Sequence, residues 1–293
     1  MRYSSPSRKV FVVINTILLI FMSFLCLFPV VHVLAVSLST KLAAVSGSVT
    51  FYPMGFTLDS YRFILKQAEF YQSFLIAIYR TVIGVPVNML LIILAAYPLS
   101  KPKSEFRFRN IYSWYFVLTI LLSVGLIPLY MTIRMLGLID NLFALILPTA
   151  VPVYSMLIVM NYFRSIPKEM SESAFLDGAS HWRVLFQIIV PLSMPALATV
   201  FLFSMVSHWN SWFDGLIFMN NPKNYPLQSY LQTVVVQSGN AFISARALAE
   251  LSKVSNITVK SAQLFVAIIP MMIAYPFIQK YFTKGIMLGA VKD

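Results

Sequence analysis

The stretch VFVVINTILLIFMSFLCLFPVVHVLAVSL, residues Val10–Leu38, contains no Asp, Glu, Lys or Arg. A helix needs about 20 predominantly apolar residues to cross a bilayer, so this run can span one with tilt or with an interfacial extension. Arg8 and Lys9 precede the run and resemble the charged start of a signal peptide. The apolar core of a signal peptide has only about 7–15 residues, however, so we favour a retained membrane anchor.

The composition of the whole chain agrees with a membrane protein. Of its 293 residues, 59% are hydrophobic and 11% are charged, whereas soluble domains carry about 25% charged residues. Such a chain cannot cover its surface with polar groups, so much of that surface must face lipid. The single cysteine, Cys26, excludes an internal disulfide and a cysteine-based metal cluster, and the three histidines are too far apart for a local metal motif. We expect neither a metal site nor catalytic residues.

Further apolar runs recur along the chain. We predict an all-α polytopic membrane protein in which residues 1–9 form a tail and residues 10–293 form one transmembrane domain. Its six spans are expected at residues 10–38, 72–99, 111–133, 141–160, 188–219 and 262–282. Seven prolines fall inside these runs, namely Pro86, Pro128, Pro148, Pro152, Pro195, Pro270 and Pro276. We expect kinks rather than breaks there, because neighbouring helices can satisfy the carbonyls that a proline frees.

Basic residues gather on one side of the predicted spans. They precede the first span and follow the second, fourth and sixth: Arg2, Arg8, Lys9, Lys101, Lys103, Arg107, Arg109, Arg164, Lys168, Arg183, Lys280, Lys284 and Lys292. The positive-inside rule makes this side cytoplasmic, with both termini there. This topology explains much of the net charge of +12 and argues against nucleic-acid binding.

Two long loops are then extracytoplasmic, where a soluble partner can dock. They comprise residues 41–71 and 220–261. Within the second loop, Tyr230–Val236 is compatible with either a strand or a short helix, and its periodicity does not decide between them.

The loop between the fourth and fifth spans contains SIPKEMSESAFLDGA, residues 165–179. Ser165 can cap a helix, Pro167 suits its first turn, and Gly178 can take the left-handed conformation that ends it. Ser180 can cap a second helix, so the loop is predicted to form a helix–Gly–helix. The first helix is too short to be stable alone, and its acidic residues would be repelled by anionic lipid. We therefore expect it to dock into a groove of a protein partner.

A three-part motif runs through this loop. It consists of Glu172-Ser173-Ala174, then Gly178, then Ile188-Ile189-Val190-Pro191. It resembles the EAA loop of ABC importer permeases, in which nine residues separate the glycine from I-x-L-P, as nine do here. Ser173 and Val190 replace the alanine and leucine of the family pattern, which are small or apolar changes.

The resemblance implies that residues 164–187 form a coupling loop seated in a cleft of an ATPase. The residues expected at this contact are Glu172, Ser173, Ala174, Asp177, Gly178 and Ala179. Two further segments, Ala95–Ser100 and Gln279–Lys292, are similar to the carbohydrate-importer branch of the family. That branch comprises second permease subunits of maltose-type systems, which import oligosaccharides or polysaccharide fragments such as alginate. In such relatives the C-terminal tail can also reach the ATPase pair.

A permease of this kind works in a complex in the bacterial inner membrane. The resemblance implies a second, different permease, two cytoplasmic ATPases and an extracytoplasmic solute-binding protein. No glycine in the chain is followed by lysine, so the chain has no Gly-Lys-Ser/Thr phosphate loop. We expect it to bind no cofactor and to be no enzyme by itself, while ATP and Mg²⁺ bind to the partner ATPases. The transported carbohydrate can be neutral or acidic.

Polar and aromatic residues within the spans are candidates for the substrate pathway. They are Arg80, Tyr154, Trp209, Asn210 and Trp212, with Asn88 as a weaker candidate. A buried Arg80 would mark a pathway or an ion pair, with Asp214 as a partner, whereas the alternative is snorkelling to the surface. On a continuous helix Trp209 and Trp212 share a face, while Asn210 points about 100° away. An aromatic belt at the membrane interface is the alternative role for the tryptophans.

Other functions agree less well with the sequence. A secondary active transporter would carry coupling-ion carboxylates at mid-membrane, and none of the six predicted spans has an acidic residue at its centre. A membrane-embedded enzyme needs a nucleophile–base or metal constellation, which three scattered histidines do not provide. A non-transporting scaffold agrees with the composition but leaves the EAA-type loop unexplained.

Overall fold

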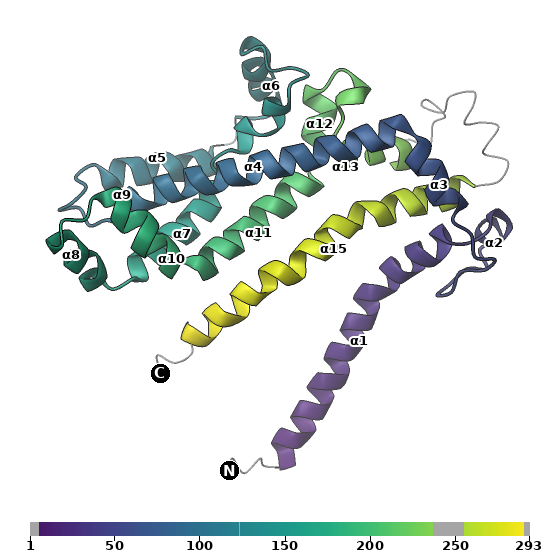
Figure 1. Cartoon of the computed structure of the whole chain (residues 1–293), viewed down its shortest axis with the longest axis horizontal. Helices are drawn as coiled ribbons and strands as arrows, with labels where there is room; N and C mark the ends of the chain where they lie inside the picture. The colour runs from purple at the N-terminus through teal and green to yellow at the C-terminus, as the bar shows by residue number, and fades with distance from the viewer. Residues whose placement is uncertain (1–5, 123, 237–254, 290–293) are drawn as a thin grey trace. The chain divides into compact units, whose positions relative to one another are not determined.

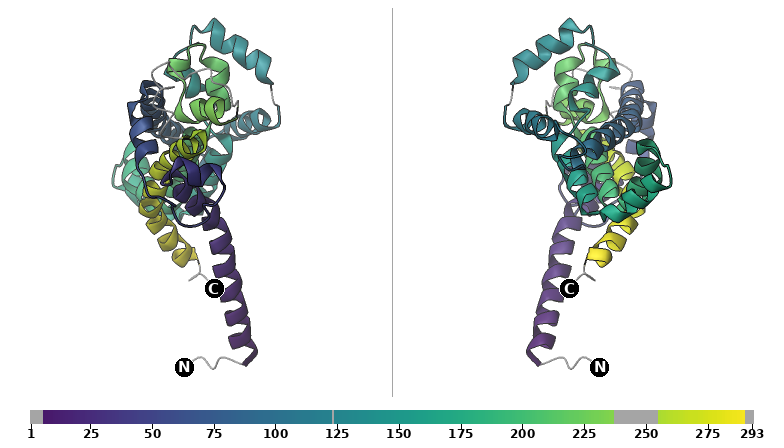
Figure 2. Two further views of the ribbon diagram at one scale, coloured as in Figure 1. Left: turned by 90° about the vertical axis from the view of Figure 1, so that its right-hand side faces the viewer. Right: turned by 90° about the vertical axis from the view of Figure 1, so that its left-hand side faces the viewer.

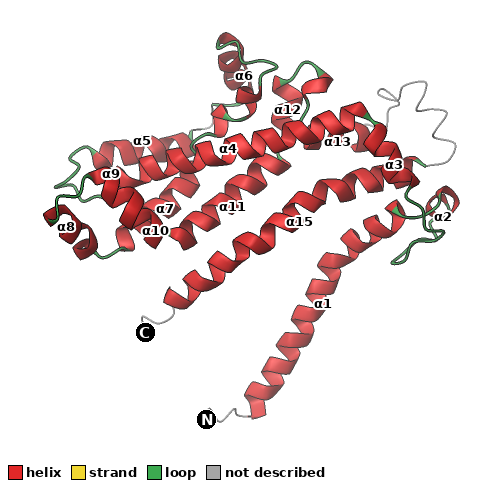
Figure 3. Cartoon of the chain, viewed as in Figure 1, coloured by secondary structure: helices red, strands yellow, loops and turns green. Residues whose placement is uncertain are grey.

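A computed structural model of the protein describes residues 6–122, 124–236 and 255–289, and every regular element in these ranges is a helix (Figure 3). The all-α prediction is therefore confirmed for this part of the chain. Helices are expected in lipid, because a helix satisfies its backbone hydrogen bonds internally where no water is present to do so.

The chain divides into two compact units. The first contains residues 1–70 and 233–269, and the second contains residues 71–232 and 270–293. Two long helices, α4 (Ala68–Ser100) and α15 (Asn256–Gly289), each contribute residues to both units.

In the first unit, α1 (Pro6–Ser37) is one unbroken helix in Figures 1 and 2, although Pro29 lies inside it. The apolar side chains from Val10 to Leu27 are exposed in the isolated chain. A helix of this length that is apolar on every face is covered by lipid or by neighbouring helices in a bilayer.

Two short helices follow α1, namely α2 (Lys41–Val45) and α3 (Asp59–Lys66). The end of α1, α2 and the loop after it share a small buried core made of Ala35, Val36, Ala44 and Val49. The hydroxyl oxygens of Ser37 and Tyr61 lie 2.7 Å apart, which ties the end of α1 to α3.

The second unit contains most of the helices. After α4 come α5 (Arg109–Leu121), α6 (Leu126–Met135), the 3-10 turns η1 (Leu142–Leu145) and η2 (Leu147–Thr149), α7 (Val153–Ser165), α8 (Lys168–Leu176), α9 (His181–Val184), the π-helix η3 (Leu185–Ile189), α10 (Val190–Leu192), α11 (Met194–Asn210), α12 (Phe213–Phe218), the 3-10 turn η4 (Pro222–Asn224) and α13 (Leu227–Leu231).

The core of the second unit lies between α4, α7 and α11. Its centre consists of fully buried apolar side chains from these three helices: Ile92, Ala96, Met156, Val159 and Val200. In lipid, water does not drive such helices together, so close van der Waals packing holds this core.

Among the described residues, three helices are long and apolar enough to cross a membrane, namely Ser7–Ser37 of α1, α4, and Asn256–Lys280 of α15. Three further pairs of helices are long and apolar enough only when the two members of each pair are joined: α5 with α6, η1–η2 with α7, and α9–α10 with α11. If each bent pair is one span, the described residues hold six, which is the predicted number. The bounds of the individual spans stay predictions.

The expectation that prolines only kink the spans is wrong at two of them. Pro152 is the N-cap of α7, which is bent by 48° from the turns before it. Pro195 lies at the start of α11, which is bent by 83° from the helix before it. Proline has no N–H to donate and suits the first helical turn, so both residues begin a new helix. Pro86, Pro270 and Pro276 lie inside continuous helices, as expected.

The second long loop and the C-terminal segment lie partly outside the described residues. Tyr230–Val236 is helical, since α13 continues into the π-helix η5 (Gln232–Val236), whereas residues 237–254 of that loop are not described. The segment Gln279–Lys292 continues α15 to Gly289, and its side chains beyond Lys280 lie outside the described residues. The predicted reach of this tail to the ATPases is untested.

Candidate functional site

The EAA-type segment folds as two helices joined by a glycine. α8 ends at Leu176, Gly178 takes φ +78°, and the Ala179 N–H donates to the Ala174 carbonyl at 2.9 Å. Ser180 then caps α9 by accepting a hydrogen bond from the Arg183 N–H. This is the helix–Gly–helix that the sequence predicts, because a left-handed glycine and a serine cap are both local signals.

The start of α8 differs from the prediction. Ser165 is the last residue of α7, and its hydroxyl donates to the Tyr162 carbonyl at 2.7 Å, so it does not cap α8. Pro167 is the N-cap instead. The reason is Ile166, which precedes a proline and is therefore held extended, at φ −72° and ψ 131°.

The predicted coupling residues divide into exposed and packed positions. Glu172, Ser173, Asp177 and Gly178 are exposed, whereas Ala174 and Ala179 pack against the core of the second unit. Sequence reasoning did not single out Leu176, whose side chain is 89% exposed at the end of α8. Met170 and Trp182 on the same segment are also exposed. A short helix with polar and large apolar exposed groups is suited to docking on a partner.

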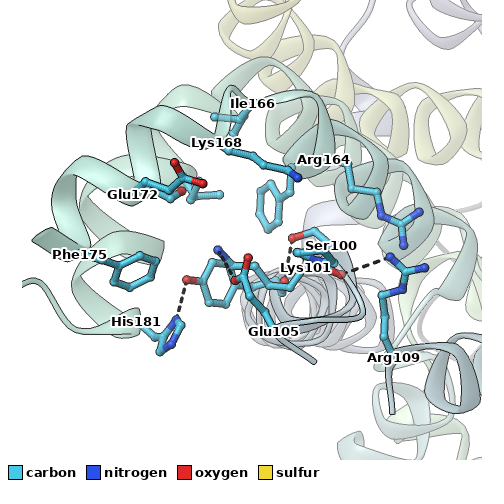
Figure 4. A pocket seen from close by; sticks show the side chains of 15 residues that line it. Ser100, Lys101, Glu105, Arg109, Arg164, Ile166, Lys168, Glu172, Phe175 and His181 are labelled. Carbon is cyan, nitrogen blue, oxygen red and sulfur yellow. Dashed lines mark hydrogen bonds and ion pairs between the residues drawn. The ribbon is translucent and has the colours of Figure 1, made fainter. Parts of the chain in front are cut away.

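A pocket of about 550 Å³ lies beside α8 (Figure 4). We call it the α8 pocket; it lies between the end of α4 and the loop after it, the start of α5, the end of α7, and α8 with α9. The residues that define it are Lys101, Arg109, Arg164, Lys168, Glu172 and Phe175. Three contacts hold its walls together. Tyr97 Oη lies 3.2 Å from His181 Nδ1, and Lys101 Nζ lies 5.1 Å and 5.5 Å from the ring centroids of Tyr97 and Phe175.

Arg80 is buried and paired with Asp214, as the sequence suggested. Its side chain is not at the surface, since the residue is only 1% exposed, so the snorkelling alternative is wrong. The guanidinium binds both carboxylate oxygens of Asp214 and also donates to the Leu145 carbonyl at 3.2 Å. Arg80 therefore joins α4 to α12 and η1, and its role in a substrate pathway stays a prediction.

A row of buried polar groups continues from this pair along α4 and α11, which run in opposite directions (Figure 1). His208 of α11 lies against Gly84 of α4, since a Cβ on Gly84 would be 2.7 Å from the imidazole ring. One turn further along each helix come Asn88 and Ser204, both 3% exposed. His208 Nε2, Asn88 Oδ1 and Ser204 Oγ have no hydrogen-bond partner among the described residues. The sequence does not predict that His208 lies against Gly84, because only the packing of α11 on α4 brings them together, and it gives no signal for Ser204.

The tryptophans are arranged differently from the prediction. α11 ends at Asn210 and Ser211 is extended, so Trp209 and Trp212 do not share a helix face. Trp209 is 3% exposed and packs edge-on against Phe74, with ring centroids 5.9 Å apart. Trp212 is the N-cap of α12 and is partly exposed.

The other candidates do not form one cluster with them. Asn210 is exposed at the end of α11, and Tyr154 is 70% exposed on α7, a different helix. Within the described ranges, no three His, Cys, Asp or Glu side chains lie where they could hold a metal ion.

The chain is similar to known transport proteins over nearly its full length. Residues 1–287 match the family described as "binding-protein-dependent transport system inner membrane component". The chain is 37% identical over 274 residues to the polygalacturonan/rhamnogalacturonan transport system permease protein YtcP of Bacillus subtilis, covering 94% of this chain and 95% of the relative. It is 32% identical over 290 residues to protein LplC of the same organism, covering 99% and 97%.

A solved structure has the same fold. It is the crystal structure of a bacterial ABC transporter involved in the import of the acidic polysaccharide alginate, one chain of which matches with a TM-score of 0.87 at 31% identity. The match covers 96% of this chain and 100% of that one. The family match, the apolar helices and the EAA-type segment agree, and the protein thus belongs to the inner-membrane components of binding-protein-dependent transport systems, as a multi-pass permease of the ABC type.

Proposed function

We propose that this chain is one of two different permease subunits of an ATP-driven importer for an acidic oligosaccharide. The proposal rests on two similarities that extend over nearly the full length of the chain. One is to a permease named for polygalacturonan and rhamnogalacturonan, and the other is to a chain of a transporter involved in the import of alginate. Galacturonan and alginate are both built of uronic acids, so the substrates in the two names share a carboxylate on a sugar ring.

The orientation follows from the distribution of charge. Basic residues concentrate in three segments, namely residues 1–9, the loop 101–109 and the coupling loop 164–187. By the positive-inside rule, these segments lie in the cytoplasm. Residues 41–71 and 220–261 face outward, where an extracytoplasmic solute-binding protein delivers the substrate.

Energy comes from two separate ATPase subunits, which bind ATP and Mg²⁺. We propose that α8 docks in a cleft of one ATPase, with Glu172, Ser173, Asp177 and Gly178 at the contact and Ala174 and Ala179 holding α8 on the permease. The exposed Leu176 supports this proposal, since an isolated leucine on a short, polar helix gains most from burial against a partner.

Within the pathway, the exposure of each candidate suggests its role. Asn210, Trp212 and Tyr154 have exposed side chains that a sugar can contact through hydrogen bonds and ring faces. Arg80 and Trp209 are buried in this chain, so we propose that they position the pathway and do not contact the substrate. An arginine already neutralised by Asp214 is not a recognition site for a uronate.

The test is ATP hydrolysis by the purified complex in proteoliposomes, with its binding protein loaded with one saccharide at a time. Oligogalacturonate and an alginate oligomer are compared with a neutral arabino-oligosaccharide of similar length. Stimulation by one or both acidic saccharides, and not by the neutral one, is the expected result. Equal stimulation by the neutral saccharide would refute an acidic substrate, and no stimulation by any saccharide would refute a carbohydrate importer.

A further inference from the structure

The α8 pocket carries more positive than negative charge. Lys101, Arg109, Arg164 and Lys168 line it, against Glu105 and Glu172. Glu105 is already paired with Lys101, with Nζ and Oε2 3.5 Å apart. Arg109, Arg164 and Lys168 form no salt bridge with any described residue within 4.0 Å. Three cations in one pocket are therefore left without a carboxylate.

The two arginines of the pocket bind only neutral groups. Arg109 Nη1 donates to the Lys101 carbonyl at 3.3 Å, and Arg164 Nη2 donates to the Leu99 carbonyl at 2.8 Å. Their guanidinium groups are close enough for their positive charges to repel each other, and both are seen on the same side of the pocket in Figure 4.

Capping of α4 explains only part of this arrangement. The carbonyls of Leu99 and Lys101 lie at the C-terminal end of α4, where a positive charge stabilises the helix dipole. One arginine would be enough to provide this stabilisation.

Arg109 also donates to the Asn110 side chain, and Arg164 Nη2 donates to Met160 Sδ at 3.3 Å. Each guanidinium has five N–H donors, so after these bonds both keep donors that no described atom accepts. Two neighbouring guanidinium groups with N–H donors to spare can bind an anion that has several oxygens, above all a phosphate.

The pocket lies at the ends of candidate membrane spans. Arg109 is the first residue of α5 and Arg164 is in the last turn of α7, and each of these helices belongs to a bent pair that is long and apolar enough to cross a membrane. The end of such a span is where lipid headgroups are expected. Phe163, Ile166 and Phe175 add apolar wall beside the cations. A cationic pocket with an apolar wall at this depth is complementary to an amphiphile.

We propose that the α8 pocket binds the phosphate of an anionic phospholipid headgroup, with Arg109 and Arg164 as its main ligands and Lys168 at its edge. The assignment to the cytoplasmic leaflet rests on the orientation proposed above, whereas the site itself does not. A lipid held here contacts α8 and the ends of α4 and α7 at once, so it would stabilise the segment that docks on the ATPase.

The test is lipid binding to the intact complex, purified through a tag on this chain, delipidated, and titrated with phosphatidylglycerol under native mass spectrometry. The variant Arg109→Gln with Arg164→Gln is compared with wild type and with Arg107→Gln, an exposed arginine of the same loop outside the pocket. We expect binding about tenfold weaker or more in the double variant, because each charge-assisted contact is worth about one order of magnitude in affinity. Arg107→Gln should bind as wild type does.

Two further arms identify the source of the anion. Phosphatidylcholine should bind much more weakly than phosphatidylglycerol, and inorganic phosphate at millimolar concentration should not displace the lipid. Full displacement by inorganic phosphate would overturn the lipid in favour of a free anion. If the double variant loses its ATPase subunits but binds lipid normally, an acidic group of the ATPase occupies the pocket and the proposal is wrong.

The remaining outcomes are also decisive. Equal lipid binding by all variants, or equal loss in the Arg107→Gln control, would overturn the site. If the double variant does not assemble, Lys168→Gln provides the test, with a loss of several-fold expected and unchanged binding against the proposal. A complex that binds lipid here but imports no saccharide would refute the proposed function and leave this site standing.

Discussion

Arg80 in α4 and Asp214 in α12 form a bidentate ion pair, although 134 positions separate them in the sequence. Nη1 lies 3.1 Å from Oδ1, and Nη2 binds Oδ2. Ser211 Oγ and the Gly215 N–H also donate to Oδ1, at 2.8 Å and 2.9 Å, so the carboxylate is fixed from two sides. The break between α11, which ends at Asn210, and α12, which begins at Phe213, is thereby anchored on α4.

Neutralising one member of this pair should destabilise the protein strongly. Breaking a buried pair leaves a charge uncompensated and costs about 3–5 kcal/mol, so Arg80→Gln and Asp214→Asn should each lower the unfolding midpoint in detergent. The double variant should lose less than the sum of the two, since it leaves no lone charge. Arg62→Gln is the control, because its pair with Asp59 is exposed and long, at 3.9 Å, and contributes about 0–1 kcal/mol. Strictly additive losses would show that the pair is not coupled.

Gly84→Ala should destabilise the contact between α4 and α11. The new methyl group would lie 2.7 Å from atoms of the His208 ring, which is buried and has little room to move. Overpacking of this kind costs about 1–3 kcal/mol, measured as the unfolding midpoint of the purified protein. His208→Ala should restore stability in the Gly84→Ala background. A Gly84→Ala variant as stable as wild type would mean that the two helices do not approach this closely.

Gly178→Asp should impair coupling without preventing membrane insertion. An L-residue at φ +78° is strained by about 1–2 kcal/mol, yet a Cβ at Gly178 meets no atom within 4 Å, so the chain itself has space for it. Gly178→Asn is the matched control, because Asn and Asp tolerate this backbone equally and differ in charge. We expect the Asp variant to lose most transport and most binding-protein-stimulated ATP hydrolysis, and the Asn variant to keep much more of both. Normal transport by Gly178→Asp would exclude a tight contact there.

Leu176→Asp should weaken the binding of the ATPase to the permease. Burying a leucine is worth about 1.5–3 kcal/mol, so about tenfold or more of ATPase affinity should be lost, measured by titrating ATPase onto the purified permease pair. Leu65→Asp is the control, since Leu65 is 74% exposed on α3, far from α8 in the sequence and in the other unit. If both variants bind ATPase equally well, α8 does not dock through Leu176.

Local signals in the sequence predicted local structure well. The run Val10–Leu38 contains almost all of α1, and Gly178 ends the α8 turn, because hydrophobic length and a left-handed glycine depend on few neighbours. The sequence offers the pair of Arg80 with Asp214 as one of two alternatives, since a buried charge needs a partner, and the burial of Arg80 decides against snorkelling. The sequence does not predict the break after Asn210, because the expected span runs on to residue 219. The hydroxyl of Ser229 in α13, which donates to the Trp212 carbonyl at this break, comes from 17 positions further along the chain. The α8 pocket joins residues from four segments, and only tertiary packing assembles them.

Uptake of a labelled acidic oligosaccharide into proteoliposomes tests the central claim most directly. The vesicles contain this chain with its partner permease and ATPases, with loaded binding protein outside and ATP inside. Accumulation should require both ATP and binding protein, and vesicles with this chain alone should accumulate nothing, even under an imposed proton or sodium gradient. Accumulation by the lone chain under such a gradient would contradict the account, because it would make the protein a secondary transporter.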